Sequence, residues 1–367
     1  MKAQGKMGQT ISDIQQYNVL ASALMTQNTG TNWHYNVGTN MIGCGNTGAH
    51  QGMFVSGSAN PAENVGSVTV CLPFILTALS GTTPTRYIPA FGRDSLRFRY
   101  YLDSQANAFT QNDLVAPITN STGVISIHEV EAVMYIVELS PSAQQLVSAM
   151  CGNVYNILCA DWRTANGSFA GTGAPLTNVT TLGFSVSSLE RVVIVHRDSA
   201  NQGTILRNSI GARSTATLNE FQLILNGEAF PSRPILAQGN VGEGRGAEML
   251  AETLVAQHAL SDFGHESQLA NAGQLLAPNY AKFQESIATG IDEANTGTFV
   301  CGVELESMAG KSSNIYSGIS TIGSVVQFRG VYTAPGAATT FALAFYAQST
   351  ILLTLDMGGL ATFVVSV

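Results

Sequence analysis

Residues 188–197 (SLERVVIVHR) and residues 218–227 (LNEFQLILNG) carry the strand patterns that decide the fold of this chain. The second stretch alternates apolar with polar side chains. Because successive side chains of a strand point to opposite faces, this alternation predicts a half-buried strand over residues 218–225. The first stretch predicts a strand over residues 191–196.

Further strands are predicted on both sides of these two. Residues 96–102 (LRFRYYL) alternate, and residues 130–139 are nearly continuously apolar, as a strand in the core of a sandwich can be. The other predicted strands cover residues 183–186, 299–305, 323–332, 340–346, 349–355 and 360–367. Residues 356–359 (DMGG) separate the last two, and because glycine tolerates positive φ they predict a hairpin turn.

Helix signals are few. Ser140 is predicted to cap a helix that has Pro141 in its first turn and ends at Cys151-Gly152. A second helix is predicted over residues 247–260. Turns are predicted to fill residues 164–180, and the turn-rich residues 199–216 are predicted to join two domains.

Residues 1–32 read as an N-terminal arm with a weakly amphipathic helical pattern. Two interpretations stay open for it. The arm packs as a terminal helix on its own domain, or it reaches a neighbouring subunit or an inner surface. Under the second interpretation, its apolar side chains would face an internal membrane.

The order of motifs from residue 188 onward resembles a known family. Residues 188–197, 218–227 and 230–235 (FPSRPI) resemble the join between the two domains of double jelly-roll major capsid proteins. In that family an S-L strand ending in Arg leads to an aromatic-Gln strand, a Gly, a P-x-x-P segment and a helix. The resemblance is to the adenovirus-hexon-like lineage of tailless icosahedral DNA viruses.

The C-terminal part is similar to the same family. Residues 305–306, 316–321 and 323–326 resemble its "D-L-E … S-G-I-N-T … S-x-I" sequence, and residues 345–346 with 353–356 resemble its closing "Y-D-x-x-L-x-I-D" pattern. Ser320 stands where Asn is common, and Ala347 stands where Asp is common. The first half of the chain matches the family only in plan and length.

The resemblance implies an all-β fold of two tandem jelly-roll β-sandwiches, each with a short inserted helix. The expected divisions are residues 1–32 for the arm, 33–205 for the first jelly roll and 206–367 for the second. It further implies a structural major capsid protein whose homotrimers form pseudo-hexagonal capsomers that tile an icosahedral shell. The expected location is the virion, after synthesis in the host cytoplasm.

Composition agrees with a protein that works in an assembly. Hydrophobic residues make up 45% of the 367 residues, but charged residues only 11%, against roughly 25% in ordinary globular proteins. A surface so poor in charge is expected to be covered by neighbouring subunits. The five cysteines form no CxxC pair, which favours free thiols in a reducing cytoplasm.

Charge limits the expected partners. The net charge is −8 and the 16 Lys and Arg residues are scattered, so no direct nucleic-acid binding is expected. The expected partners are other copies of the chain, in the trimer and in neighbouring capsomers, and minor capsid and vertex proteins. An internal membrane beneath the shell is a further candidate. No signal peptide is expected, and the longest apolar stretch, residues 70–79, is too short to span a bilayer.

No motif predicts catalysis. Residues 242–246 (GEGRG) and 310–312 (GKS) lack the spacing of phosphate-binding loops, and His128-Glu129 lacks the second His of a zinc-protease helix. We therefore expect no enzyme, and no catalytic, cofactor-binding or metal-binding residues. Two alternative functions stay open: a vertex or minor capsid protein, and a carbohydrate-binding β-sandwich protein.

Overall fold

The computed structural model describes residues 1–4, 10–28, 97–104, 127–131, 136–152, 154–202, 214, 216–237, 246–256, 300–306, 318–356 and 362–366. Within them the chain is mostly β-strand in antiparallel sheets, with few helices. The strands are β1 (Lys2–Gln4), β2 (Thr10–Asp13), β3 (Arg97–Arg99), β4 (Val154–Ala170), β5 (Leu176–Leu182), β6 (Leu189–Asp198), β7 (Leu218–Leu225), β8 (Glu228–Leu236), β9 (Cys301–Glu304), β10 (Val326–Tyr332), β11 (Thr340–Asp356) and β12 (Thr362–Ser366). The helices are α1 (Tyr17–Asn28), α4 (Pro141–Cys151), the 3-10 turn η5 (Ser199–Asn201) and α5 (Gly246–Ala256).

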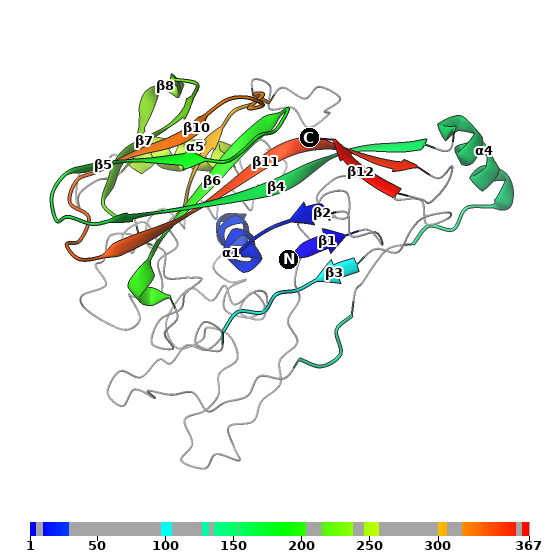
Figure 1. Cartoon of the computed structure of the whole chain (residues 1–367), viewed down its shortest axis with the longest axis horizontal. Helices are drawn as coiled ribbons and strands as arrows, with labels where there is room; N and C mark the ends of the chain where they lie inside the picture. Colours follow the sequence, from blue (N-terminus) through cyan, green and yellow to red (C-terminus); the bar gives the residue numbers. More distant parts are fainter. Residues whose placement is uncertain are drawn as a thin grey trace, which may run out of the picture.

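Strands β4 to β11 form a two-sheet sandwich with jelly-roll order (Figure 1). One sheet has the order β5-β10-β7-β8, and the other has the order β4-β11-β6-β9. If the eight strands β4 to β11 are numbered 1 to 8 along the chain, one sheet has the order 2-7-4-5 and the sheet packed against it has the order 1-8-3-6. A jelly roll is defined by eight strands that form two Greek keys in two facing sheets.

This sandwich crosses the expected boundary between residues 33–205 and 206–367. β4, β5 and β6 precede the boundary and β7 to β11 follow it, yet both sheets contain strands from each side. The boundary placed at residue 205 is therefore wrong for the described residues. β6 ends at Asp198 in one sheet and β7 begins at Leu218 in the other, so the turn-rich sequence between them joins two strands of one sandwich, and such a connection favours the same turn residues as a domain junction. Residues 29–96, which belong to the expected first jelly roll, lie outside the described residues, so that domain stays a prediction.

The β4-β11-β6-β9 sheet is buried on both faces. In β6, Val192 and Ile194 pack in the core between the two sheets, while Val193 and Val195 pack in a second core on the opposite face. In β11, Phe345 and Tyr346 divide between the two cores in the same way. The period-two alternation of a strand therefore supplies two cores from one sheet.

The N-terminal arm forms the other side of the second core. β2, β1 and β3 make a small antiparallel sheet, and α1 follows β2 beside the larger sheet (Figure 1). Ile11, Ile14 and Leu20 are at most 3% exposed and contact residues of β4, β6 and β11 in one cluster. The arm thus packs on its own domain, which confirms the first interpretation. A membrane-facing arm would need these side chains on the surface.

Several local predictions are confirmed. Ser140 accepts a hydrogen bond from the N–H of Ala143, Pro141 opens α4, and Gly152 ends it in the left-handed conformation. β7 covers residues 218–225 as predicted, and β6 extends the predicted strand at residues 191–196. β10 and β12 lie within predicted strands, and β9 lies within the predicted residues 299–305.

Other local predictions are wrong. The predicted turns at residues 164–180 belong largely to β4 and β5, because a 17-residue ladder with β11 stabilises β4 despite its Gly and Asn. Residues 183–186 form no strand, although Phe184 and Val186 are buried. β11 is one strand over the two predicted at residues 340–346 and 349–355. In the predicted strand at residues 130–139, those described are exposed and irregular.

Two predictions extend beyond the described residues. α5 is described to Ala256, so the end predicted at residue 260 is not covered. β11 and β12 pair in antiparallel fashion, as a hairpin requires, but most of the predicted turn at residues 356–359 lies outside the described residues. Among the described helices, none has the length and apolar character needed to cross a membrane.

Candidate functional site

The family-like motifs meet at one end of the sandwich. Leu189, from the S-L motif, and Ile319, from the S-G-I motif, exchange two backbone hydrogen bonds of 2.8 and 2.9 Å. An added Cβ at Gly318 would lie 2.5 Å from the Ser188 hydroxyl and 2.7 Å from the Leu189 carbonyl oxygen. Glycine at this position therefore lets the two segments approach each other.

Thr321 completes this junction. Its hydroxyl accepts a hydrogen bond from the N–H of Val186 at 2.9 Å and donates one to the carbonyl of Val186 at 3.3 Å. The N–H of Thr321 also donates to that carbonyl at 2.8 Å. Because Thr321 is fully buried, these bonds satisfy backbone groups that water does not reach. The motif residues 318–321 thus fasten the loop before β10 to the loop before β6.

The β7–β8 turn lies at the same end. Asn226 donates from its backbone N–H to the carbonyl of Val325, and its side chain bonds the hydroxyl of Ser324 and the N–H of Val325. Nearby Ile322 and Val325 are 59% and 53% exposed. This end therefore combines a rigid hydrogen-bonded frame with apolar side chains at the surface.

The aromatic-Gln and P-x-x-P motifs pair with each other. Gln222 in β7 lies where the β7–β8 register shifts, and its side-chain amide donates to the carbonyl of Pro231 at 3.0 Å. Pro231 and Pro234 lie inside β8, which is the edge strand of its sheet. Neither proline ends the strand. They interrupt the hydrogen-bonding edge, which hinders pairing with a further strand.

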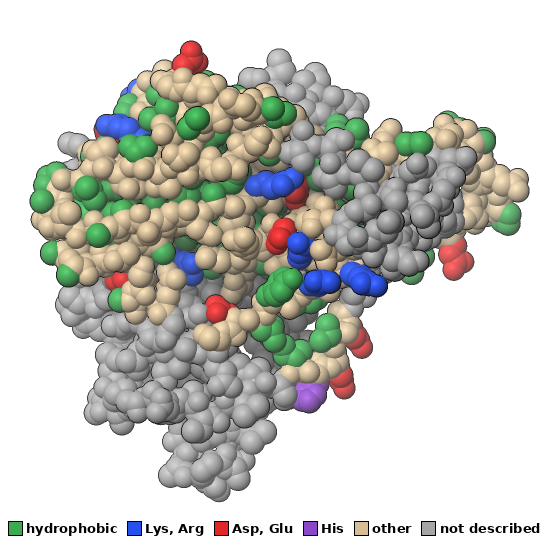
Figure 2. Space-filling view, viewed as in Figure 1, with side chains coloured by type: hydrophobic (Ala, Val, Ile, Leu, Met, Phe, Trp, Pro, Cys, Tyr) green, Lys and Arg blue, Asp and Glu red, His purple; other side chains and the backbone are tan. Residues whose placement is uncertain are grey.

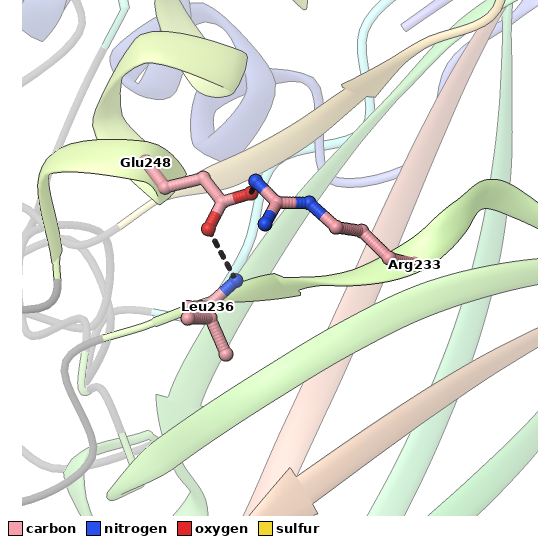
Figure 3. Close-up of polar contacts among 3 residues, drawn as sticks. All are labelled: Arg233, Leu236 and Glu248. Carbon is pink, nitrogen blue, oxygen red and sulfur yellow. Dashed lines mark hydrogen bonds and ion pairs between the residues drawn. The ribbon is translucent and has the colours of Figure 1, made fainter.

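Glu248 in the first turn of α5 fastens this helix to β8 (Figure 3). Its carboxylate accepts from the Arg233 guanidinium at 2.6 Å and from the N–H of Leu236 at 3.4 Å. The Arg233 side chain is 75% exposed, so its ion pair contributes little to stability. The carboxylate near the helix N-terminus is also favoured by the helix dipole.

Arg191 of β6 connects its own strand with β4, β11 and α5. It donates to the side chain of Gln348 in β11 and to the carbonyl of Ala256 in the last turn of α5 at 2.9 Å. Its guanidinium lies 5.5 Å from the centre of the Trp162 ring in β4. Burial lowers the pKa of Arg191, and nearby carboxylates, Glu304 first, oppose that shift. Arg191 is therefore a structural cation that holds β4, β6, β11 and α5 together.

A second polar group holds the N-terminal arm. Asp161 in β4 accepts a 2.6 Å hydrogen bond from the Ser12 hydroxyl, and Arg163 lies 3.4 Å from the same carboxylate. Burial raises the pKa of Asp161 to about 6, although Ser12 and Arg163 act in the opposite direction. The turn after β2 is held as well, since Tyr346 donates to the carbonyl of Gln16 and Arg197 to its side chain.

One histidine lies in the core between the two sheets. His196 in β6 is fully buried, and its Nε2 lies 2.9 Å from the hydroxyl of Tyr332 in β10. Burial lowers the pKa of His196 to about 3 and raises the pKa of Tyr332. The pair thus joins the two sheets through a neutral hydrogen bond.

These polar groups have structural partners within the described fold. In the part of the chain that the structure describes, no three His, Cys, Asp or Glu side chains gather in a way that could hold a metal ion. His128 and Glu129 lie in an irregular segment, and residues 242–245 and 310–312 lie outside the described residues. Figure 2 shows charged side chains in small scattered groups among hydrophobic and uncharged ones.

The sequence did not single out Asp161, and it assigned no role to His196 or Thr321, although these two lie within the motifs that resemble the capsid family. Each is a polar residue at an inward-facing position of a strand or loop, and this becomes visible only when the pairing is known. Arg191, Gln222 and Gly318 carry a signal in the sequence, because they belong to the motifs that resemble the capsid family.

Comparisons with known proteins give matches among solved structures. No family model and no curated protein matches the sequence. The chain is similar to PBCV-1 VP54, fitted into a reconstruction of the virophage Sputnik, with 13% identity, a TM-score of 0.34, and coverage of 62% of this chain and 55% of that one. It is similar to a quasi-atomic model of the PBCV-1 virus capsid, with 12% identity, a TM-score of 0.33, and coverage of 58% and 52%. It is also similar to the mavirus major capsid protein, with 12% identity, a TM-score of 0.29, and coverage of 58% and 41%. The chain spans about half the length of these solved chains.

Proposed function

We propose that this chain is a structural major capsid protein whose homotrimers form pseudo-hexagonal capsomers in an icosahedral viral shell. The observation that carries the proposal is the eight-stranded jelly roll, β4 to β11, with the capsid-like motifs at its inter-strand junctions. Jelly rolls are a recurrent building block of viral shells. The motif residues that the structure describes form contacts between strands or loops of this sandwich.

The surface supports a role in assembly. α4 contains no charged residue and no buried residue, and Leu146 and Met150 on it are 62% and 79% exposed. It lies at the far end of the long β4–β11 ladder (Figure 1). Exposed apolar surface of this kind marks sites of protein association.

The same features support a non-enzymatic role. Arg191, Asp161 and His196 hold elements of the fold together, and each bonds to structural partners. The net charge of −8 supports an inner face that does not bind the genome directly. In this proposal the protein resides in the virion after synthesis in the host cytoplasm. Its partners are its own copies, minor capsid and vertex proteins, and in viruses that have one, the membrane beneath the shell.

The vertex alternative has one observation in its favour. The described residues contain one jelly roll, and vertex proteins of such viruses usually carry a single one. The two functions differ in symmetry, because a double jelly roll makes a pseudo-hexagon from three chains, whereas a vertex requires five.

The solution mass of the full-length protein separates these functions. Light scattering after size exclusion should give about 116 kDa, which is three times the chain mass of 38.6 kDa. Electron microscopy at higher concentration should then show flat hexagonal arrays or closed shells. A pentamer would establish the vertex alternative. A monomer at every concentration would overturn both, and tight binding in a glycan array would then favour the carbohydrate-binding protein.

A further inference from the structure

Two short segments of this chain have matching alternation and opposite charge. β3 reads Arg97-Phe98-Arg99, and a separate segment reads Glu129-Val130-Glu131. In each, two like charges two residues apart flank one apolar side chain. In an extended chain both charges therefore fall on one face and the apolar side chain on the other.

β3 presents an open edge. The small sheet has the order β2-β1-β3, so β3 pairs with β1 on one side only within the described residues. Arg97 and Arg99 are exposed, and beyond the backbone ladder with β1 neither side chain forms a hydrogen bond or ion pair with another described residue. Phe98 is half-buried and packs against the second core. An open strand edge is a template for pairing with another strand.

The acidic segment resembles a strand in sequence but not in structure. The pattern over residues 130–139 predicts a strand, yet residues 127–131 and 136–140 are exposed and irregular. Val130 is 74% exposed and Ile136 is 81% exposed. Glu129 has a φ of +53°, a conformation that L residues with a side chain seldom adopt. Pairing as a strand would restore negative φ and cover Val130.

We propose that residues 129–131 of one copy add to the β3 edge of a second copy and form a contact between subunits. Antiparallel pairing would place Glu131 opposite Arg97, Glu129 opposite Arg99, and Val130 over Phe98. Oppositely charged pairs directly across two strands stabilise a sheet. This inference rests on the proposed function, because it assumes that copies of the chain associate.

We assign the strand that pairs with the β3 edge to a second copy of the chain for a geometric reason. A ring or lattice built from heterologous contacts needs two different, mutually complementary patches on every chain. The β3 edge and residues 129–131 meet this requirement, and the structure leaves them unpaired with each other in one chain. Charge complementarity and a shared two-residue spacing give both the attraction and the register.

Charge reversal tests the contact. R97E/R99E and E129R/E131R should each raise the concentration for half-maximal assembly about ten-fold or more, and the combined variant should return to within about two-fold of wild type. Glu228→Arg, an exposed reversal on β8, is the control and should assemble like wild type. Circular dichroism and melting temperature establish that each variant is folded.

Disulfide trapping tests, independently of charge, whether a second chain supplies the segment that pairs with β3. A mixture of the Phe98→Cys and Val130→Cys chains, mildly oxidised, should give a cross-linked dimer that neither chain gives alone. Val179→Cys, at a position of β5 that is 50% exposed, replaces Val130→Cys in the control mixture and should give no dimer. A link formed only when both cysteines are in one chain would overturn the second copy as occupant.

The outcomes separate this contact from the proposed function. If both charge-reversal variants assemble like wild type and the mixture gives no cross-link, the proposed contact is overturned and the capsid function is unaffected. A wild-type chain that stays monomeric overturns both.

Discussion

Asp161 provides a sharp test of how the N-terminal arm is held. Its carboxylate is 1% exposed, lies between Ser12 of β2 and Arg163 of its own strand, and has a pKa of about 6 because of burial. Replacement by Asn removes the charge and keeps the shape, including an oxygen that accepts the Ser12 hydrogen bond. We expect Asp161→Asn to stabilise the protein at pH 7.5.

The magnitude follows from linkage. The folded-state pKa of about 6 lies above the reference value of 3.8, so the folded state binds this proton more tightly than the unfolded state does. The resulting stability is fully present below pH 3.8 and is lost as the pH rises through about 6. A difference of about two pH units between the folded and unfolded pKa values corresponds to about 3 kcal/mol, which is an upper estimate of the gain from Asn. The attraction of Arg163 is already contained in the pKa of about 6.

Thermal unfolding followed by circular dichroism at pH 7.5 and pH 4 measures this effect. Asp161→Asn should melt several degrees higher than wild type at pH 7.5, and the difference should shrink at pH 4. Ser12→Ala serves as the opposite variant. It removes a hydrogen bond to the charged carboxylate, so it should destabilise at pH 7.5 by about 1–3 kcal/mol and by less at pH 4.

The reasoning is refuted if Asp161→Asn melts below wild type at pH 7.5. That result would mean that the ion pair with Arg163 outweighs the burial of the carboxylate. Equal effects at both pH values would show that the change acts through packing rather than charge.

Three further predictions concern the sandwich and its helix. Gly318→Ala should lower the free energy of unfolding by about 2 kcal/mol in denaturant titrations, because its Cβ would collide with backbone, whereas Gly183→Ala, with nothing within 4 Å of the new Cβ, should change it little. His196 has a pKa lowered to about 3 against 6.5, so it contributes stability above pH 6.5 that is lost as the pH falls toward 3; His196→Gln should flatten this loss in unfolding curves, and an unchanged slope would contradict it. Glu248→Ala should destabilise by about 1 kcal/mol, and Arg233→Ala by less than about 0.5 kcal/mol, because only the first removes the carboxylate that accepts the bond from the β8 backbone and favours the helix N-terminus. An equal loss in the two variants would assign the effect to the exposed ion pair.

The sequence by itself determined the elements whose signals are local. A cap, a proline and a terminal glycine lie within one helix, so Ser140 and Gly152 marked α4 correctly. The alternation over residues 218–225 marked β7, because its apolar face is buried whatever strand lies beside it. Composition indicated an all-β chain, and the motif order from residue 188 onward pointed to a capsid-like sandwich.

The tertiary structure decided which strands pair. β4 finds its partner in β11, far away in the sequence, and this ladder makes a strand of residues that read as turns. β6 pairs with β11 and β7 pairs with β10, so the strands on either side of the predicted domain junction belong to two sheets of one sandwich. The nearly continuously apolar residues 130–139 gave the opposite error, since the described part of this stretch has no strand partner among the described residues.

Burial of polar side chains also depended on the tertiary structure. Asp161, His196 and Thr321 look like ordinary polar residues until the arm, the second sheet or a neighbouring loop covers them. Their energetics arise from loss of water and from partners that distant segments supply. Sequence therefore determined which segments favour strand or helix, and the distant contacts determined which of them meet and what their polar groups do.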